Sequence, residues 1–503
     1  MMASVFRALP VLRRAAPNLS RELFTCRTCS TKATASLRSK ALLMSNIPRN
    51  YGIRWNSTQA IPSQAVSQHG AKLVASKTGT ENGAKEGGRA TSRVYPQTSD
   101  KLVAYWLLGS AASVFGIVVF GGLTRLTESG LSITEWRPVT GSLPPMSAEK
   151  WESEFTKYRA SPEFHLLNPN MTLEEFKKIY WMEWTHRVWG RAIGITFLLP
   201  TAYFILRRRV APHMAWKLVG ICGLIGFQGV IGWWMVKSGL KDELFAPGSH
   251  PRVSQIRLTV HLGAAFAVYA AMLRSGLSIL REHGARAASP EEADKLVRKL
   301  LHPRMRVFRG LVGALTLLIF ATAMSGALVA GLDAGLIYNE FPYMGVGLAP
   351  PKSELFDPRY SRIEGQSDLV WRNVLENPSL VQLDHRALAT TTFSAIMALW
   401  CYARFGRSMR AVLPHNACKG VTGLVHLAWV QVTLGISTLL YLVPTWLAAA
   451  HQAGSLALLT GALVLSSRVG GSARVLSLLR QRARLAAKHN GKSVADVLGP
   501  KKV

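Results

Sequence analysis

Four histidines lie at corresponding places in apolar stretches of the chain and could ligate a metal. They are His186, His261, His385 and His451, near the start of the second, fourth, sixth and eighth apolar segments. If these segments are membrane-spanning helices, all four begin on one side of the membrane and the imidazoles lie at similar depth. Two neutral imidazoles that face each other across a helix bundle suit the axial positions of a haem iron. We therefore expect one haem between His186 and His261, and another between His385 and His451.

Other roles for these histidines stay open. A single histidine in a membrane helix serves structure about as often as function, because it can bond a neighbouring helix. Four histidines at equivalent places in a repeat favour the ligand interpretation. A bare zinc site is a weaker alternative, since thiolates are lacking at this depth. A fifth histidine, His426, has no counterpart in the other half of the chain, and we expect it to pack or to form a hydrogen bond.

An acidic residue distinguishes the first histidine from the third. Glu183 precedes His186 by three residues, which places both on one helical face, whereas Gln382 stands at that distance before His385. This difference suggests proton-coupled chemistry in the first half and an electron-transfer haem in the second. We expect Glu183 to act as a base or to stabilise developing positive charge. An ion pair with Arg187, one turn further on, is an equally good interpretation.

The composition indicates that helices in a membrane carry these residues. Of the 503 residues, 49% are hydrophobic and 17% are charged, against about 25% charged in soluble domains. The net charge of +32 is concentrated in the N-terminal arm, short loops and the C-terminal tail, so we expect no nucleic-acid partner. Eight segments are long and apolar enough to be spanning helices: 102–124, 185–206, 218–236, 255–280, 310–331, 384–403, and two between 420 and 467 that Pro444 divides.

An internal repeat divides these segments into two groups of four. Residues 121–145 align without gaps on residues 326–350, with identical residues at positions that include Gly121, Gly130, Glu135 and Pro145. Chance similarity between Gly- and Leu-rich segments explains a match of this length poorly. Because four is an even number, both halves share one orientation, as in a parallel repeat. The fold class is therefore an all-α membrane protein whose eight transmembrane helices form two four-helix bundles, residues 101–282 and 283–467, followed by a basic tail, 468–503.

The N-terminal arm and the loop charges predict the location. Residues 1–80 hold twelve Lys or Arg and one acid, Glu22, which is typical of a mitochondrial transit peptide, with a disordered basic tail as the alternative. We assign residues 1–100 to the transit peptide and a flexible linker. The loops after even-numbered segments are basic, and the long loops 123–183 and 331–383 are acidic. The chain is thus expected in the mitochondrial inner membrane, with both termini in the matrix and the haem sites toward the intermembrane space.

At the histidines, the sequence resembles the haem A synthases of mitochondria and alpha-proteobacteria. The matching stretches include FGGLTRLTESGLSITEW, EWTHRVWGR, PRVSQIRLTVHLGAAFA and VQLDHRALAT, and the resemblance covers roughly residues 100–465. It implies oxidation of the C8 methyl of haem O to a formyl group, which gives haem A for cytochrome c oxidase. It also implies that His186 and His261 hold the iron of haem O or haem A, that His385 and His451 hold a permanent haem b, and that Glu183 is the functionally important acid.

The resemblance further implies a reaction course and partners. Successive hydroxylations, with water as the oxygen source, lead to a gem-diol that dehydrates, while electrons leave through the second haem. The expected partners are membrane lipid, the prenylating haem O synthase, a ferredoxin-type electron partner and further copies of the chain in a homo-oligomer. A cysteine pair found in the first outer loop of some bacterial relatives is absent here. A dihaem electron-transfer cytochrome and a non-catalytic haem transporter or assembly factor are the alternatives.

Overall fold

The computed structural model describes residues 95–246 and 249–489. The expected transit peptide and nearly all of the linker therefore lie outside the described residues, as does the end of the basic tail. Within the described ranges the chain is helical, with one isolated β-bridge between Met344 and Gly347. The predicted all-α fold class is thus confirmed.

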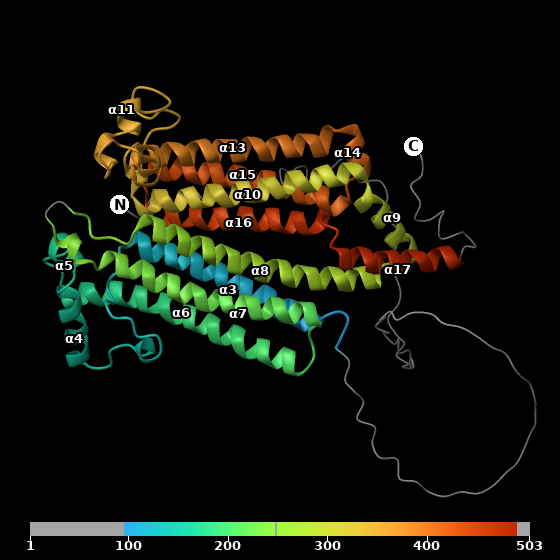
Figure 1. The fold of residues 1–503 in the computed structure, drawn as a ribbon, viewed down its shortest axis with the longest axis horizontal. Helices are drawn as coiled ribbons and strands as arrows, with labels where there is room; N and C mark the ends of the chain where they lie inside the picture. Colours follow the sequence, from blue (N-terminus) through green and yellow to red (C-terminus); the bar gives the residue numbers. More distant parts are fainter. Residues whose placement is uncertain (1–94, 247–248, 490–503) are drawn as a thin grey trace, which may run out of the picture. The chain divides into compact units, whose positions relative to one another are not determined.

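Each of the eight apolar segments is a helix of at least 25 residues (Figure 1). In chain order they are α3 (Lys101–Leu126), α6 (Leu173–Leu206), α7 (Pro212–Val236), α8 (Gln255–Ala287), α10 (Pro303–Gly331), α13 (Pro378–Phe405), α15 (His415–Leu440) and α16 (Thr445–Val469).

Seven helices of the described chain are long and apolar enough to cross a membrane, and α13 is not among them. Its sequence carries Asp384 and Arg386 near one end and three consecutive threonines from Thr390, which lower its hydropathy. Since α13 packs against both α10 and α15, it occupies the place that an eighth spanning helix would take. The count of eight spans stays a prediction.

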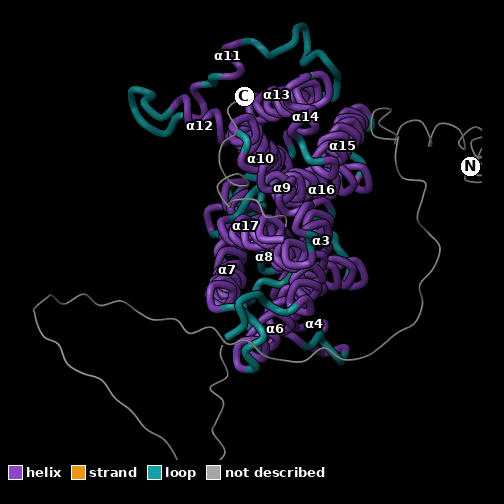
Figure 2. Tube along the Cα trace, turned by 90° about the vertical axis from the view of Figure 1, so that its right-hand side faces the viewer, coloured by secondary structure: helices purple, strands orange, loops and turns teal. Residues whose placement is uncertain are grey.

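The long helices pack in two matched sets. In the first half α3 packs on α6 and α8, and α7 packs on α6 and α8; in the second half α10 packs on α13 and α16, and α15 packs on α13 and α16. The halves meet through α3, α8, α10 and α16 (Figure 2). Buried apolar side chains of these four helices, such as Leu107, Met272, Val312 and Leu456, belong to one core. A duplicated bundle accounts for this pattern, while its axis along the membrane normal stays a prediction.

Helix α6 begins a full three turns before the predicted segment at 185. Thr172 and Glu175 form a capping box that starts the helix at Leu173. The added turns pack on α4 (Ala148–Arg159) and α5 (Pro162–Leu167), where Phe155 and Phe176 are buried against each other. A search for apolar segments missed these turns because only one face of them is apolar. That face packs on α4 and α5, and the other faces are polar.

The shorter helices lie at the two ends of the long ones. Helices α4, α5 and α11 lie at one end and α9, α14 and α17 at the other (Figure 1). The remaining bounds are α9 (Pro290–Leu301), α11 (Lys352–Leu355), α12 (Leu369–Glu376), α14 (Arg407–Val412) and α17 (Ala473–His489), with 3-10 turns at Thr140–Ser142, Lys237–Gly239, Asp242–Phe245, Ala334–Leu336 and Pro358–Tyr360.

Candidate functional site

Each of the four histidines packs against a glycine of a neighbouring helix. A Cβ atom built on these glycines would lie 2.8–3.1 Å from the imidazole Cε1, closer than real Cβ contacts normally are. The pairs are Gly121 with His186, Gly232 with His261, Gly326 with His385, and Gly435 with His451. Each imidazole is therefore positioned by a helix backbone, and a larger residue at the glycine has no room.

The two halves build this contact in the same order. The first helix of each half, α3 or α10, supplies the glycine for the first histidine, and the third helix, α7 or α15, supplies it for the second. The third helix also supplies a glutamine whose side-chain amide donates to the backbone of that second histidine: Gln228 Nε2 to His261 O at 2.8 Å, and Gln431 Nε2 to His451 O at 2.9 Å. The sequence did not single out these glutamines, although they stand at equal distances before Gly232 and Gly435.

The structure brings His385 and His451 close together. The ring centroids of His385 and His451 are 6.4 Å apart and the ring planes are nearly perpendicular, at 88°. Two imidazoles on opposite sides of one metal, each bound by a nitrogen at about 2.0 Å, have centroids roughly 6.4 Å apart. This spacing fits two imidazole ligands of an iron porphyrin. His186 and His261 repeat the glycine contacts of the second pair, and their pairing stays a prediction.

The donor set also fits a porphyrin better than a bare ion. No group of three or more His, Cys, Asp or Glu residues in the described part of the chain is arranged to hold a metal. A pair of imidazoles supplies two ligands, and a haem brings the remaining four nitrogens itself.

The Nδ1 atoms differ between the halves. His385 Nδ1 lies 2.8 Å from Ser325 Oγ, and Ser325 Oγ donates its proton to Thr322 O at 2.8 Å. Nδ1 therefore donates to Ser325, which leaves Nε2 as the unprotonated atom that a metal requires. Gln431 Nε2 lies 3.1 Å from His451 Nδ1 and, as an amide nitrogen, donates to it, so this contact orients the ring but does not favour an unprotonated Nε2. By contrast, the Nδ1 atoms of His186 and His261 are buried without a hydrogen-bond partner in the described structure, so hydrogen bonds orient the imidazoles of the second pair only.

Glu183 is buried, with 3% of its surface exposed, and its carboxylate is held by several donors. Arg187 Nη2 and Nε donate to Oε1 at 2.6 and 3.0 Å, while Ser132 Oγ and the Ile133 amide donate to Oε2 at 2.7 and 2.8 Å. The ion pair with Arg187 is therefore formed, and Glu183 fixes the loop after α3 onto α6. Ser132 and Ile133 were not found from the sequence, since no spacing rule connects them to Glu183.

In the second half a neutral residue, Gln382, stands at the position that matches Glu183. Gln382 Nε2 donates to Tyr338 O at 3.0 Å, and Arg386 donates to the same carbonyl at 2.9 Å. In the first half, Arg187 donates to Ile133 O at 2.8 Å. Both halves thus use an arginine to hold the outer loop, but a buried carboxylate lies beside the first histidine in the N-terminal half alone.

Residues 104–463 match the family model of the cytochrome oxidase assembly protein, COX15-CtaA. The chain belongs to this family. The match includes Glu183 and all four histidines, so the site described above lies within the region that defines the family.

Several curated members of the family are close relatives. The chain is 52% identical to the heme A synthase COX15 of Saccharomyces cerevisiae over 74% of this chain and 76% of the relative. It is 45% identical to the heme A synthase COX15 of Homo sapiens over 77% of this chain and 87% of the relative. It is also 52% identical to the heme A synthase-mitochondrial ferredoxin fusion protein of Schizosaccharomyces pombe over 73% of this chain, and the match spans 60% of that protein.

In this member of the family the loop before α6 holds a second buried carboxyl group, Glu163, which is 4% exposed. Tyr158 donates a hydrogen bond to it at 2.9 Å. Burial, with a contribution from the charge of Glu183, raises the pKa of Glu163 to about 8. The folded loop therefore binds a proton that the unfolded chain releases above its ordinary pKa of 4.5.

We expect Glu163→Gln to flatten the pH dependence of stability. With a raised folded-state pKa, the contribution of Glu163 is fully present below 4.5 and is lost as the pH rises through about 8. Glu163 should contribute a loss of up to about 5 kcal/mol of stability across this window, and the variant should lack this loss. Thermal unfolding in detergent across the window measures it, with the exposed Glu174→Gln as control. Parallel pH profiles for wild type and Glu163→Gln would contradict the assignment.

Proposed function

We propose that this chain is a haem A synthase, which oxidises the C8 methyl of haem O to a formyl group and supplies haem A for cytochrome c oxidase. Relatives named heme A synthase, 42–52% identical over most of the chain, support this function. The observation that carries it is the duplicated site: two pairs of imidazoles, each backed by a glycine, with one carboxylate that distinguishes the halves.

His186 and His261 would hold the substrate haem, and His385 and His451 would hold a permanent haem b. The contact of Ser325 with His385 Nδ1 supports this division, because a cofactor that stays needs ligands in fixed orientation. A substrate haem must enter and leave the site, and imidazoles whose Nδ1 atoms have no hydrogen-bond partner can change orientation as it does so. When bound, the haems supply the oxidisable methyl group and the path for electrons.

Water is the proposed oxygen source. With the iron held by both His186 and His261, dioxygen would reach it only if one imidazole left. Four donated hydrogen bonds fix the Glu183 side chain in place, which suits it to stabilise positive charge that develops on the substrate. We assign Glu183 this electrostatic and positioning role.

Glu183→Gln should retain both haems while haem O accumulates, with haem A lower by at least about tenfold. The amide keeps the shape of the side chain but removes the negative charge beside His186. Haem extraction followed by chromatography measures both products. Ser132→Ala, which keeps the charge and removes one hydrogen bond, should have a smaller effect. A normal haem A content in Glu183→Gln would show that the reaction does not need the negative charge of Glu183.

The pigments of the purified protein test the function as a whole. Haem B together with haem O or haem A is expected for a synthase. Haem B alone would favour a dihaem electron-transfer cytochrome and contradict the proposal.

The location and partners follow from the same assignment. Mitochondrial relatives and the spanning helices support a multi-pass protein of the mitochondrial inner membrane. We propose that both termini face the matrix and that the haem sites lie toward the intermembrane space. The fission yeast relative is named as a fusion with a mitochondrial ferredoxin, which supports a ferredoxin-type electron partner here. Haem O synthase as the supplier of substrate, and a homo-oligomer, complete the proposal.

A further inference from the structure

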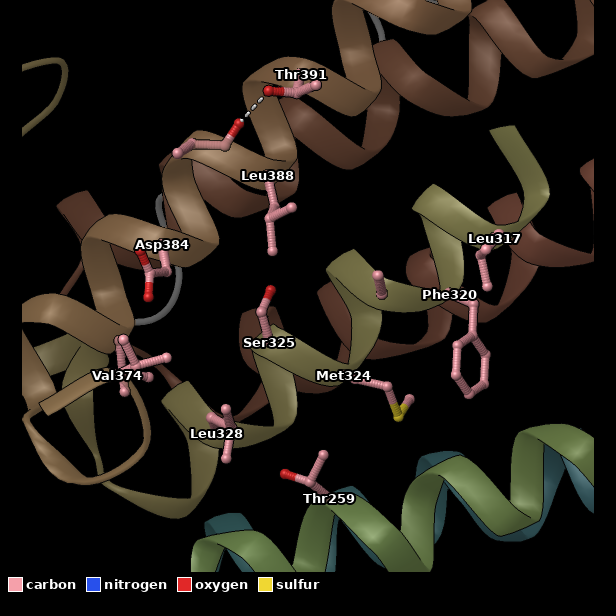
Figure 3. A pocket seen from close by; sticks show the side chains of 13 residues that line it. Thr259, Leu317, Phe320, Met324, Ser325, Leu328, Val374, Asp384, Leu388 and Thr391 are labelled. Carbon is pink, nitrogen blue, oxygen red and sulfur yellow. Dashed lines mark hydrogen bonds between the residues drawn. The ribbon is translucent and has the colours of Figure 1, made fainter. Parts of the chain in front are cut away.

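A cavity of about 760 Å³ lies between α8, α10 and α13, where the two halves meet (Figure 3). Most of its wall is apolar and comes from α10 and α13: Leu317, Phe320, Met324, Leu328 and Leu388. Because helices assigned to the membrane form the wall, a ligand for this cavity would be an apolar molecule that dissolves in the bilayer.

The cavity also contains a carboxylate that the protein leaves without a partner. Asp384 projects into it from α13 (Figure 3), and no residue of the described chain forms a hydrogen bond or ion pair with it. The nearby hydroxyl groups of Thr259 and Thr391 donate to carbonyls of their own helices, Gln255 O and Ala387 O. A carboxylate without a partner beside an apolar wall is costly, and a ligand hydroxyl that donates to Asp384 would lower that cost.

The cavity wall is in direct contact with a haem ligand. Ser325 lines the cavity and accepts the hydrogen bond from His385 Nδ1. A molecule in the cavity is therefore separated from the imidazole by one side chain.

The N-terminal half fills the equivalent space with aromatic side chains. Trp189 follows His186 by three residues, as Leu388 follows His385, and Phe120 precedes Gly121 as Ser325 precedes Gly326. The rings of Phe120 and Trp189 lie 6.0 Å apart. A Cβ atom on Gly116 would be 2.8 Å from Trp189, whereas Ala321 stands at the matching position of α10. The open cavity is thus a property of the second half and not of the duplicated fold.

We propose that this cavity binds a quinol of the membrane, with its chain among the apolar side chains of α10 and α13 and a ring hydroxyl donating to Asp384. The apolar wall, the single acceptor and the contact to His385 through Ser325 fit a redox carrier of this class.

This inference rests on the proposed function, because the contact to His385 matters for redox chemistry only if that imidazole holds haem b. The quinol would be the product form, made when a quinone in the cavity gains two electrons and two protons. Haem b, when held by His385 and His451, would supply the electrons one at a time, the aqueous phase would supply the protons, and a ring hydroxyl formed in this way would donate to Asp384. The cavity would thereby provide an exit for electrons withdrawn from the substrate.

The test introduces into the cavity the tryptophan and glycine that stand at the matching positions of the N-terminal half. The double variant Ala321→Gly/Leu388→Trp should weaken binding of decylubiquinol to the purified full chain by at least about tenfold, and Asp384→Ala should weaken it as well. Isothermal titration measures the affinity, and haem extraction shows whether haem B is retained. Val430→Trp is the matched control, because it adds the same ring at an exposed position of α15.

The outcomes separate this inference from the proposed function. Loss of decylubiquinol affinity in the filled variant with unchanged haem B content supports the site. Unchanged affinity, or the absence of saturable binding to wild type, overturns it. If the filled variant binds decylubiquinol normally but no longer converts haem O, the cavity holds the prenyl chain of the substrate and the quinol site is wrong. Saturable binding by a protein that lacks haem B would contradict the proposed function while the binding site stands.

Discussion

His385→Ala and His451→Ala are each expected to remove haem b from the purified protein. His385 and His451 would both hold the iron in the proposed site, so either variant removes one of the two ligands that the protein would supply. The haem B content should fall by at least about tenfold. Extraction with acidified solvent and chromatography of the pigments measures the content directly.

The corresponding variants of the first half should behave differently. His186→Ala and His261→Ala should retain haem B and lose haem O and haem A, because these imidazoles belong to the substrate site. His426→Ala, a histidine of α15 outside both pairs, should retain all pigments. Equal loss of haem B from all four site variants would contradict the division into a substrate half and a cofactor half.

Gly435→Val should abolish haem b binding although the ligands themselves are unchanged. A Cβ at this position lies 2.8 Å from His451 Cε1, so the imidazole must move away from the position in which it faces His385. Branched valine adds two further methyl groups in the same space. We expect haem B to fall by at least about fivefold, since ligand geometry controls haem affinity, as measured by pigment extraction.

The same helix offers a matched control. Gly423 lies on α15 with no atom within 4 Å of its Cβ position, so Gly423→Val changes the helix propensity equally and leaves His451 in place. Haem B content that is equal in Gly435→Val and Gly423→Val would show that the glycine contact does not position the imidazole.

The sequence by itself determined the all-α fold class and the places of the eight long helices, and it singled out the four histidines as candidate ligands. These features depend on properties that are local in the chain: the length of an apolar segment, the period of a helix and the spacing within a repeat. It also identified Glu183 and its possible partner Arg187, because residues four apart on a helix are neighbours.

Only the tertiary structure decided how these residues are held and what surrounds them. The glycines that face the histidines, the bonds from Ser132 and Ile133 to Glu183, and the contact of Ser325 with His385 all join residues on different elements, at least 16 positions apart in the chain. The cavity beside Asp384 exists because Leu388 and Ser325 leave space that Trp189 and Phe120 fill in the other half. Such contacts depend on the side chains that meet across helices, and the periodicity of a single helix indicates which face is buried but not what it meets.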